Sequence, residues 1–194
     1  MTPLGKLASL ILLGAGAAAA AASGNQLAAA SGDAATMIRQ MAGTWKVQQR
    51  MWPAPGAQPL VLPAAIARRE VLAGGFLQEE MKATSGKAPD AFTRLAYFNY
   101  NPVSQQYEYF SIDSRAPQMM NERGQAQDQK GLSLDGTTFT APRWGEMSNT
   151  SFHYRLLVGA VENDRQQVQL YLTPQSPAGS GEFLAFEYVY TRQR

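Results

Sequence analysis

The chain contains no cysteine, and this absence excludes several kinds of site. Disulfides, thiolate metal sites, cysteine nucleophiles and lipid attachment through an N-terminal cysteine all require a thiol. Histidine is nearly absent as well, because His153 is the single example. One histidine without cysteine disfavours a structural zinc site, and we expect no metal and no cofactor.

Charge is also sparse. Only 16% of the residues are Asp, Glu, Lys or Arg, and the formal net charge is +2. No run of Lys and Arg follows the chain in the way that phosphate-backbone binding requires. We therefore expect no nucleic-acid partner.

Long apolar runs are confined to the N-terminus. Lys6 precedes an apolar stretch over residues 7–22, which ends in Ala20-Ala21-Ala22. This order of a positive residue, an apolar run and small residues is typical of a signal peptide, with cleavage after residue 22 or, alternatively, after residue 30. An uncleaved membrane anchor is the weaker alternative, because the alanine-rich end is poorly hydrophobic.

The sequence therefore predicts an exported protein, periplasmic or extracellular. Residues 23–36 are expected to be a flexible segment, and residues 37–194 to form one domain. No stretch after the leader approaches the roughly 20 apolar residues of a spanning helix, so no stable membrane insertion is expected after cleavage.

The remaining chain alternates between apolar and polar residues with period two. About ten extended runs follow one another with turn residues at intervals of about 8–12 positions, a spacing typical of all-β sandwiches and barrels. Asp135-Gly136 predicts a hairpin turn. Residues 57–66, with Pro59 and Pro63, predict a loop or lid, and residues 33–42 predict a short helix that plugs one barrel end.

The first and last runs carry the residues expected to close the barrel. Gly43-Thr44-Trp45 opens the first run, and Arg192 closes the last. If these runs pair, the guanidinium lies over the indole face in a cation–π contact worth about 0.5–2 kcal/mol. Residues at alternate positions before Arg192 then face inward: Tyr190, Tyr188, Phe186 and Leu184.

A series of short motifs, in this order and spacing, resembles a lipocalin-like bacterial family, domain of unknown function 1579. The motifs are Gly43-Thr44-Trp45, Pro55-Gly56, Leu72 to Leu77, Tyr100-Asn101-Pro102, Tyr107, Asp113-Ser114 and Glu187 to Arg192. The resemblance covers about Met37 to Arg194. It implies an antiparallel, up-and-down calycin barrel and no established activity. Asn101 stands where the family pattern has an Asp, which we interpret as a turn cap.

Glu79 is the most informative candidate in the expected interior. Glu79 lies on the same face of its strand as Leu77 and Met81, so its carboxylate is expected to point inward. A buried carboxylate needs a partner, and Arg69 on the preceding strand is the nearest candidate. As a functional group, Glu79 is a polar anchor for a ligand or a general base with a raised pKa. The preferred interpretation is a structural ion pair, or a strand shifted in parity by a bulge at Gly74-Gly75.

Other side chains would line the same interior. Methionines and tyrosines most often fill cores, yet they also form adaptable cavity walls with polar tips. The candidates of this kind are Met51, Met81, Tyr97, Tyr109, Tyr154 and Tyr188.

His153 has one specific alternative, a haem ligand at a cavity mouth. Its alternation partners, Arg155 and Leu157, are less apolar than the opposite set of Phe152, Tyr154 and Leu156. We therefore expect His153 on the outer face or rim.

Three functions remain open. The first is an exported binding protein that holds a small apolar or amphipathic molecule inside the barrel. The second is a non-catalytic interaction or structural protein with a filled core. The third is an enzyme that uses Glu79 or Asp113 as a base on a small molecule, although the sequence offers no compelling acid–base pair for either carboxylate. The oligomeric state is not determined by the sequence.

Overall fold

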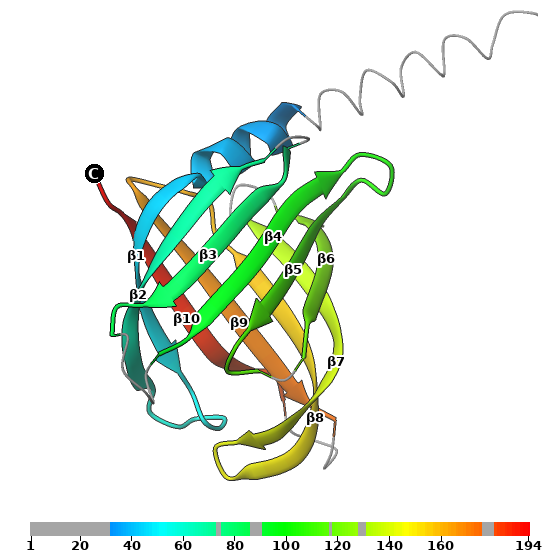
Figure 1. Ribbon diagram of the computed structural model, residues 1–194. Helices are drawn as coiled ribbons and strands as arrows, with labels where there is room; N and C mark the ends of the chain where they lie inside the picture. Colours follow the sequence, from blue (N-terminus) through cyan, green and yellow to red (C-terminus); the bar gives the residue numbers. More distant parts are fainter. Residues whose placement is uncertain (1–31, 73–74, 86–90, 117, 128–130, 176–180) are drawn as a thin grey trace, which may run out of the picture.

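The computed structural model describes residues 32–72, 75–85, 91–116, 118–127, 131–175 and 181–194. Within them a short helix at residues 32–41 precedes ten β-strands (Figure 1). The strands are β1 (Gly43–Met51), β2 (Leu60–Val71), β3 (Leu77–Ala83), β4 (Thr93–Asn101), β5 (Gln106–Asp113), β6 (Met120–Ala126), β7 (Leu132–Trp144), β8 (Met147–Val158), β9 (Arg165–Pro174) and β10 (Phe183–Arg192). The predicted leader at residues 1–22 lies outside the described residues. No helix among the described residues is long and apolar enough to span a membrane.

The strands form one closed antiparallel barrel. Each strand pairs with its neighbours in sequence, and β1 pairs with β10 to complete the ring. Trp45 is the register partner of Arg192, and the guanidinium carbon lies 4.1 Å from the centroid of the indole ring. The predicted all-β barrel and its closing contact are confirmed.

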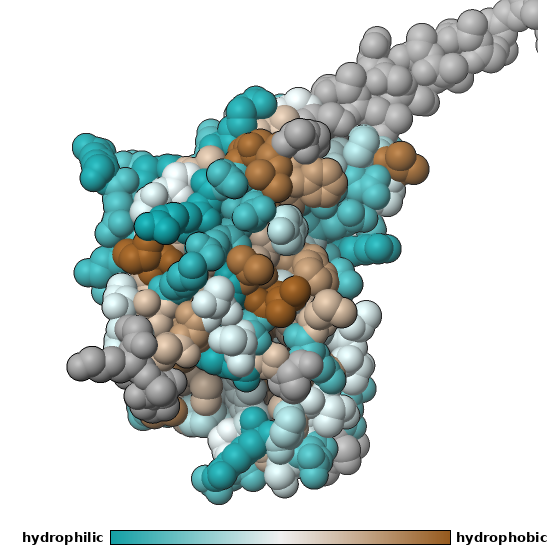
Figure 2. All heavy atoms as spheres, viewed as in Figure 1, coloured by the Kyte–Doolittle hydropathy of each residue, from teal (hydrophilic) through white to brown (hydrophobic). Residues whose placement is uncertain are grey.

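Alternation along the strands separates a packed interior from an outer face. On β1, Trp45, Val47 and Gln49 are buried, while the residues between them are exposed. Polar residues cover much of the outer face, but apolar residues gather on the outer side of β4 and β5 (Figure 2). Two register pairs form this outer apolar patch, Tyr97 with Phe110 and Leu95 with Ile112.

The helix at residues 32–41 covers one end of the barrel (Figure 1). Ala34, Ile38 and Met41 are buried and belong to the main core cluster. The indole Nε1 of Trp45 donates to the carbonyl of Met41 over 3.0 Å, and Arg192 donates to the carbonyls of Gln40 and Ala42. The predicted plug is confirmed. Residues 33–36 fell within both the predicted helix and the predicted flexible segment, and they are helical.

The prediction of a loop or lid over residues 57–66 is wrong from Leu60 onward, where β2 begins. Proline lacks the backbone N–H that a ladder needs, so Pro63 suggested a break. The strand accommodates it because the register with β1 shifts between Val47 and Gln49, beside Pro63. The Gln49 amide then donates to the Pro63 carbonyl over 2.7 Å.

The predicted hairpin turn at Asp135-Gly136 is also wrong, because β7 continues through it with a register shift. Gly136 is needed there for space: a Cβ at this position would lie 2.0 Å from the ring of Tyr154. A similar irregularity between Leu184 and Phe186 changes the parity of β10, so Phe183 and Ala185 are buried in place of Leu184.

His153 is exposed on β8, between buried Phe152 and Tyr154, as the alternation predicts. We expect His153→Ala to lower the free energy of unfolding by less than about 1 kcal/mol, because the site is exposed. Chemical denaturation at pH 7 measures this. Phe152→Ala is the matched control, with an expected loss of about 3–5 kcal/mol. A loss at His153 as large as that at Phe152 would place the imidazole in a buried network.

Candidate functional site

Three buried charged side chains from consecutive strands meet inside the barrel. Arg69 on β2 and Glu79 on β3 are direct register partners, and Arg94 lies on β4. Arg69 Nε donates to Glu79 Oε2 over 2.6 Å, and Arg94 donates to Glu79 Oε1 over 2.5 Å. Each of the three residues is at most 9% exposed. We call Arg69, Glu79 and Arg94 the ion triad.

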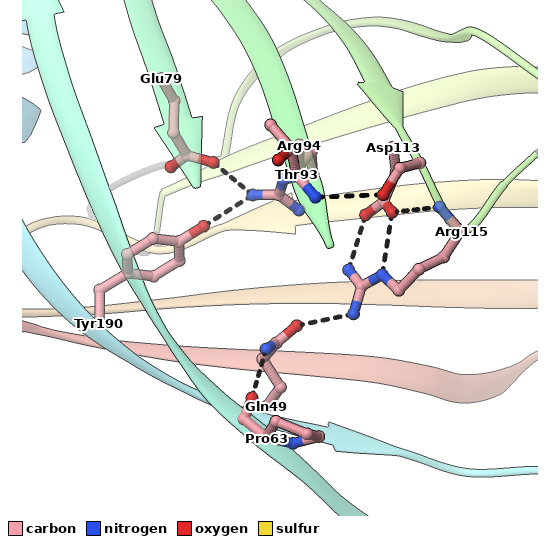
Figure 3. Close-up of polar contacts among 9 residues, drawn as sticks. Gln49, Pro63, Glu79, Thr93, Arg94, Asp113, Arg115 and Tyr190 are labelled. Atoms are coloured by element: carbon pink, nitrogen blue, oxygen red, sulfur yellow. Dashed lines mark hydrogen bonds and ion pairs between the residues drawn. The ribbon is translucent and has the colours of Figure 1, made fainter. Parts of the chain in front are cut away.

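Residues of β9 and β10 complete the polar network on the opposite side. Arg94 donates to the Tyr190 hydroxyl over 2.8 Å, and Arg69 donates to Gln166 Oε1 over 2.5 Å. The Arg69 guanidinium carbon lies 3.9 Å from the Tyr190 ring centroid. Figure 3 shows Glu79 and Tyr190 both directed toward the Arg94 guanidinium. The triad is thus held from both sides of the barrel.

Burial and charge act in opposite directions on Glu79. Burial by itself raises the pKa of a carboxyl group, but the two guanidinium groups outweigh it and lower the pKa of Glu79 to about 2. Burial raises the pKa of the Tyr190 hydroxyl to about 12. At neutral pH the triad therefore holds two positive charges and one negative charge beside a neutral phenol.

A small cavity of about 30 Å³ adjoins the triad. Because a water molecule occupies about 30 Å³ in the liquid, this space is of water size. Its polar wall consists of Arg69, Glu79, Arg94, Tyr109, Gln166 and Tyr190. Its apolar wall consists of Met41, Leu77, Ala96, Phe98, Val158 and Val168. This cavity is therefore small, and both polar and apolar side chains line it.

A second polar group lies toward the end of the barrel opposite the helix. Arg115 donates to both carboxylate oxygens of Asp113, over 2.9 and 2.6 Å, and to Gln49 Oε1 over 3.3 Å (Figure 3). Its guanidinium carbon lies 3.6 Å from the ring centroid of Phe92. Burial raises the pKa of Asp113, but hydrogen bonds from Arg115 outweigh this and lower it.

The structure brings together several of the residues that the sequence singled out. The Arg69–Glu79 pair is confirmed as a buried contact. Tyr109 lines the cavity, and Tyr188 lies under the Arg94 guanidinium at 4.7 Å. Met81 is fully buried in the main core cluster, which also contains Tyr188.

Other predicted interior residues lie elsewhere. Tyr154 packs with Phe152 and Leu172 in a core cluster separate from the main one, and its hydroxyl forms hydrogen bonds with the backbone N–H and carbonyl of Asn121. Met51 is half-buried at the end of β1 farther from the helix. The prediction for Tyr97 is wrong: it is 37% exposed on the outer face, because the inward positions of β4 are Arg94, Ala96 and Phe98.

Sequence reasoning missed three members of the interior network. Arg94 shares parity with Ala96 and Phe98, so the alternation did contain a signal for it. Gln166 lies 97 positions after Arg69, half the length of the chain, and nothing local links them. Glu122 lies on β6, where the sequence Met120–Ala126 is mostly polar and shows no apolar face.

Glu122 differs from Glu79 in that no counter-ion among the described residues lies at hydrogen-bond distance from it. It is 2% exposed, and its Oε2 atom has no hydrogen-bond partner among the described residues. Burial raises the pKa of Glu122 to about 8, while the charge of Arg94 acts in the lowering direction. The side chain is therefore a neutral carboxylic acid at pH 7.

These electrostatics bear on acid–base chemistry. A general base works best with a pKa near the working pH. The alternative of a general base with a raised pKa is wrong for Glu79, since its pKa is about 2, and the preferred interpretation, an ion pair with Arg69, is confirmed. The pKa of Asp113 is lowered as well. Both groups are therefore weak proton acceptors at neutral pH. No three His, Cys, Asp or Glu side chains within the described part of the chain form a group that could hold a metal ion.

The comparisons with known proteins extend the fold assignment to a family. No curated protein matches the chain. A family model described as a protein of unknown function, DUF1579, matches residues 31–192, which include the helix and all ten strands. The chain therefore belongs to the DUF1579 family.

Proposed function

We propose that this protein is an exported, non-enzymatic barrel that binds a small amphipathic molecule in its interior. This proposal depends on one observation: the ion triad is buried beside a small cavity that apolar side chains also line. The polar end of the molecule contacts Arg69 and Arg94, and its apolar part contacts the wall formed by residues such as Leu77 and Phe98. Export is inferred from the leader-like residues 1–22.

The energetics of buried charges support a role in recognition. Removing a carboxylate and two guanidinium groups from water costs several kcal/mol per ion, and their mutual attraction often only offsets this cost. Apolar residues of similar volume would often serve a purely structural interior as well or better. A triad with one carboxylate for two cations is better suited to binding a polar group than to filling space.

The cavity must enlarge before a ligand can bind, and its lining suggests at which end the ligand enters. About 30 Å³ is far below the roughly 300–1,000 Å³ typical of small-molecule pockets, so binding requires side chains to move. Met41, at the end of the helix, lines the cavity and has a flexible, unbranched side chain. In our proposal a displacement of Met41 and its helix opens the interior at this end.

Native mass spectrometry of the protein purified from its own host, without unfolding, tests the proposal. We expect a bound small molecule that is released on denaturation. Ala96→Leu places extra carbon atoms in the cavity wall, and we expect this variant to lose the bound mass. Ala126→Leu, at an exposed position of β6, is the matched control and should keep it.

Circular dichroism of both variants checks that they fold, because overpacking a core costs about 1–3 kcal/mol. If the folded wild type carries no bound mass, or the folded Ala96→Leu variant retains it unchanged, the interior is not the binding site. That outcome favours the second candidate, an interaction protein with a filled core.

The outer apolar patch is the observation that supports this second candidate. Tyr97 is 37% exposed and Ile112 is 43% exposed, and their register partners Phe110 and Leu95 lie beside them. Contiguous exposed apolar surface often marks a protein contact. We rank this candidate second, because it leaves the ion triad without a role.

A further inference from the structure

The charges inside the barrel do not balance. The triad has two guanidinium groups, and both oxygens of its single carboxylate are already engaged, one with each arginine. Among the described residues, the other buried carboxylates are Glu122 and Glu187. Glu187 contacts Arg50 and Gln167 on the outer side of the wall. Asp113, the register partner of Arg94 on β5, is already paired with Arg115. Among the described residues, Glu122 is therefore the buried carboxylate left to compensate the extra positive charge.

Two buried polar atoms near this surplus charge lack partners. Arg94 Nε carries an N–H with no acceptor, and Glu122 Oε2 has no hydrogen bond, among the described residues. Arg94 is 7% exposed and Glu122 is 2% exposed. Since buried polar groups are nearly always paired, these two atoms are open to a hydrogen bond from a bound polar group.

Few groups face Glu122. Its register partner on β5 is Tyr109, its partner on β7 is Gly136, which has no side chain, and Arg94 acts on it from β4. Tyr154 on β8 is also close enough to sense its charge. Arg94 is the one cation among them, and it favours ionisation less than burial opposes it, so Glu122 is protonated at neutral pH.

We propose that the interior site takes a ligand with a single negative charge, a carboxylate, and that this ligand competes with the ionised form of Glu122 for Arg94. The inference rests on the proposed interior binding function and specifies its ligand class. A carboxylate supplies the missing negative charge and an acceptor for the free N–H of Arg94. When Glu122 ionises, it supplies that charge itself, and the attraction for the ligand falls.

The experiment compares octanoate with 1-octanol, which has the same chain length but no charge. Isothermal titration calorimetry between pH 6.5 and 9.5 gives both affinities for the full folded protein. We expect octanoate to bind about tenfold or more tightly than octanol at pH 6.5, because its head group forms charge-assisted hydrogen bonds. Above about pH 8 its affinity should fall by up to about tenfold per pH unit, while that of octanol stays constant.

Glu122→Gln removes the competing charge and keeps the shape of the side chain. We expect this variant to bind octanoate as tightly as the wild type at pH 6.5 and to lose the decline at high pH. Glu146→Gln, at an exposed position, is the matched control and should keep the decline.

The outcomes separate this inference from the proposed function. Equal binding of octanoate and octanol at every pH overturns the charge inference and leaves interior binding standing. An unchanged decline in Glu122→Gln overturns the role of Glu122. Binding of neither probe, together with the absence of a bound mass in the native protein, overturns both proposals.

Discussion

Glu79→Gln is expected to lower the free energy of unfolding by about 3–5 kcal/mol, the usual effect of removing one partner from a buried ion pair. Glutamine keeps the shape of the side chain but not its charge, so Arg69 and Arg94 would remain buried close together without a counter-ion. Glu79 is 4% exposed, so water does not replace the lost interaction. Urea denaturation at pH 7, followed by tryptophan fluorescence, measures the loss.

Glu80→Gln, one position along the same strand, is the matched control. Its carboxylate pairs with Lys82 on the outer side, and both side chains are partly exposed. A surface pair of this kind contributes little, so the change should stay within about 0.5 kcal/mol. Equal losses in the two variants would show that the ion triad does not depend on the charge of Glu79.

The sign of the pH dependence gives a second check on Glu79. Its pKa in the folded protein, about 2, lies below the ordinary value of 4.5. The stabilisation is therefore present above pH 4.5 and is lost as the pH falls toward about 2. The difference in stability between wild type and Glu79→Gln should shrink over this window.

Architecture was predictable where local and long-range signals agreed. Trp45 and Arg192 begin and end the extended region, and alternation around each places both side chains on one face. A meander of antiparallel strands needs only its ends to meet in order to close. The Arg69–Glu79 pair was predictable for a similar reason, since a hairpin brings these two positions together.

The errors occurred where one residue type had two structural uses. Pro63 indicated a loop, yet a bulge opposite it lets the strand continue. Asp135-Gly136 indicated a turn, yet Gly136 provides room for the Tyr154 ring. In both cases the deciding contact comes from another strand, which a local pattern does not contain.

The rest of the interior network depends on which strands face each other across the barrel. Gln166 and Tyr190 reach Arg69 and Arg94 from the opposite wall. Glu122 lies on a strand without an apolar face, so alternation could not show that it points inward. Alternation along a strand shows which side chains share one face of that strand. Which of them come into contact depends on how the ten strands close into a barrel.

Trp45→Ala is the second large effect, with an expected loss of about 3–5 kcal/mol, as for other fully buried large aromatic residues. Trp45 is 0% exposed and contacts both β10 and the helix. Its ring lies under Arg192 and beside Tyr190, and its Nε1 holds the helix through the carbonyl of Met41. Urea denaturation followed by circular dichroism measures the loss without depending on tryptophan emission.

Trp45→Phe separates packing from the hydrogen bond. Phenylalanine keeps much of the ring volume but leaves the Met41 carbonyl without this donor, so the expected loss is about 1–3 kcal/mol. Hydrogen exchange should increase at residues 32–41 more than in the strands, because the helix loses its attachment while the barrel remains closed. Gln48→Ala, exposed on the same strand, should change neither measurement. If the helix keeps its protection in Trp45→Phe, its attachment depends instead on Arg192 and on the buried Ile38 and Met41. Opening of the interior would then require these contacts to separate as well.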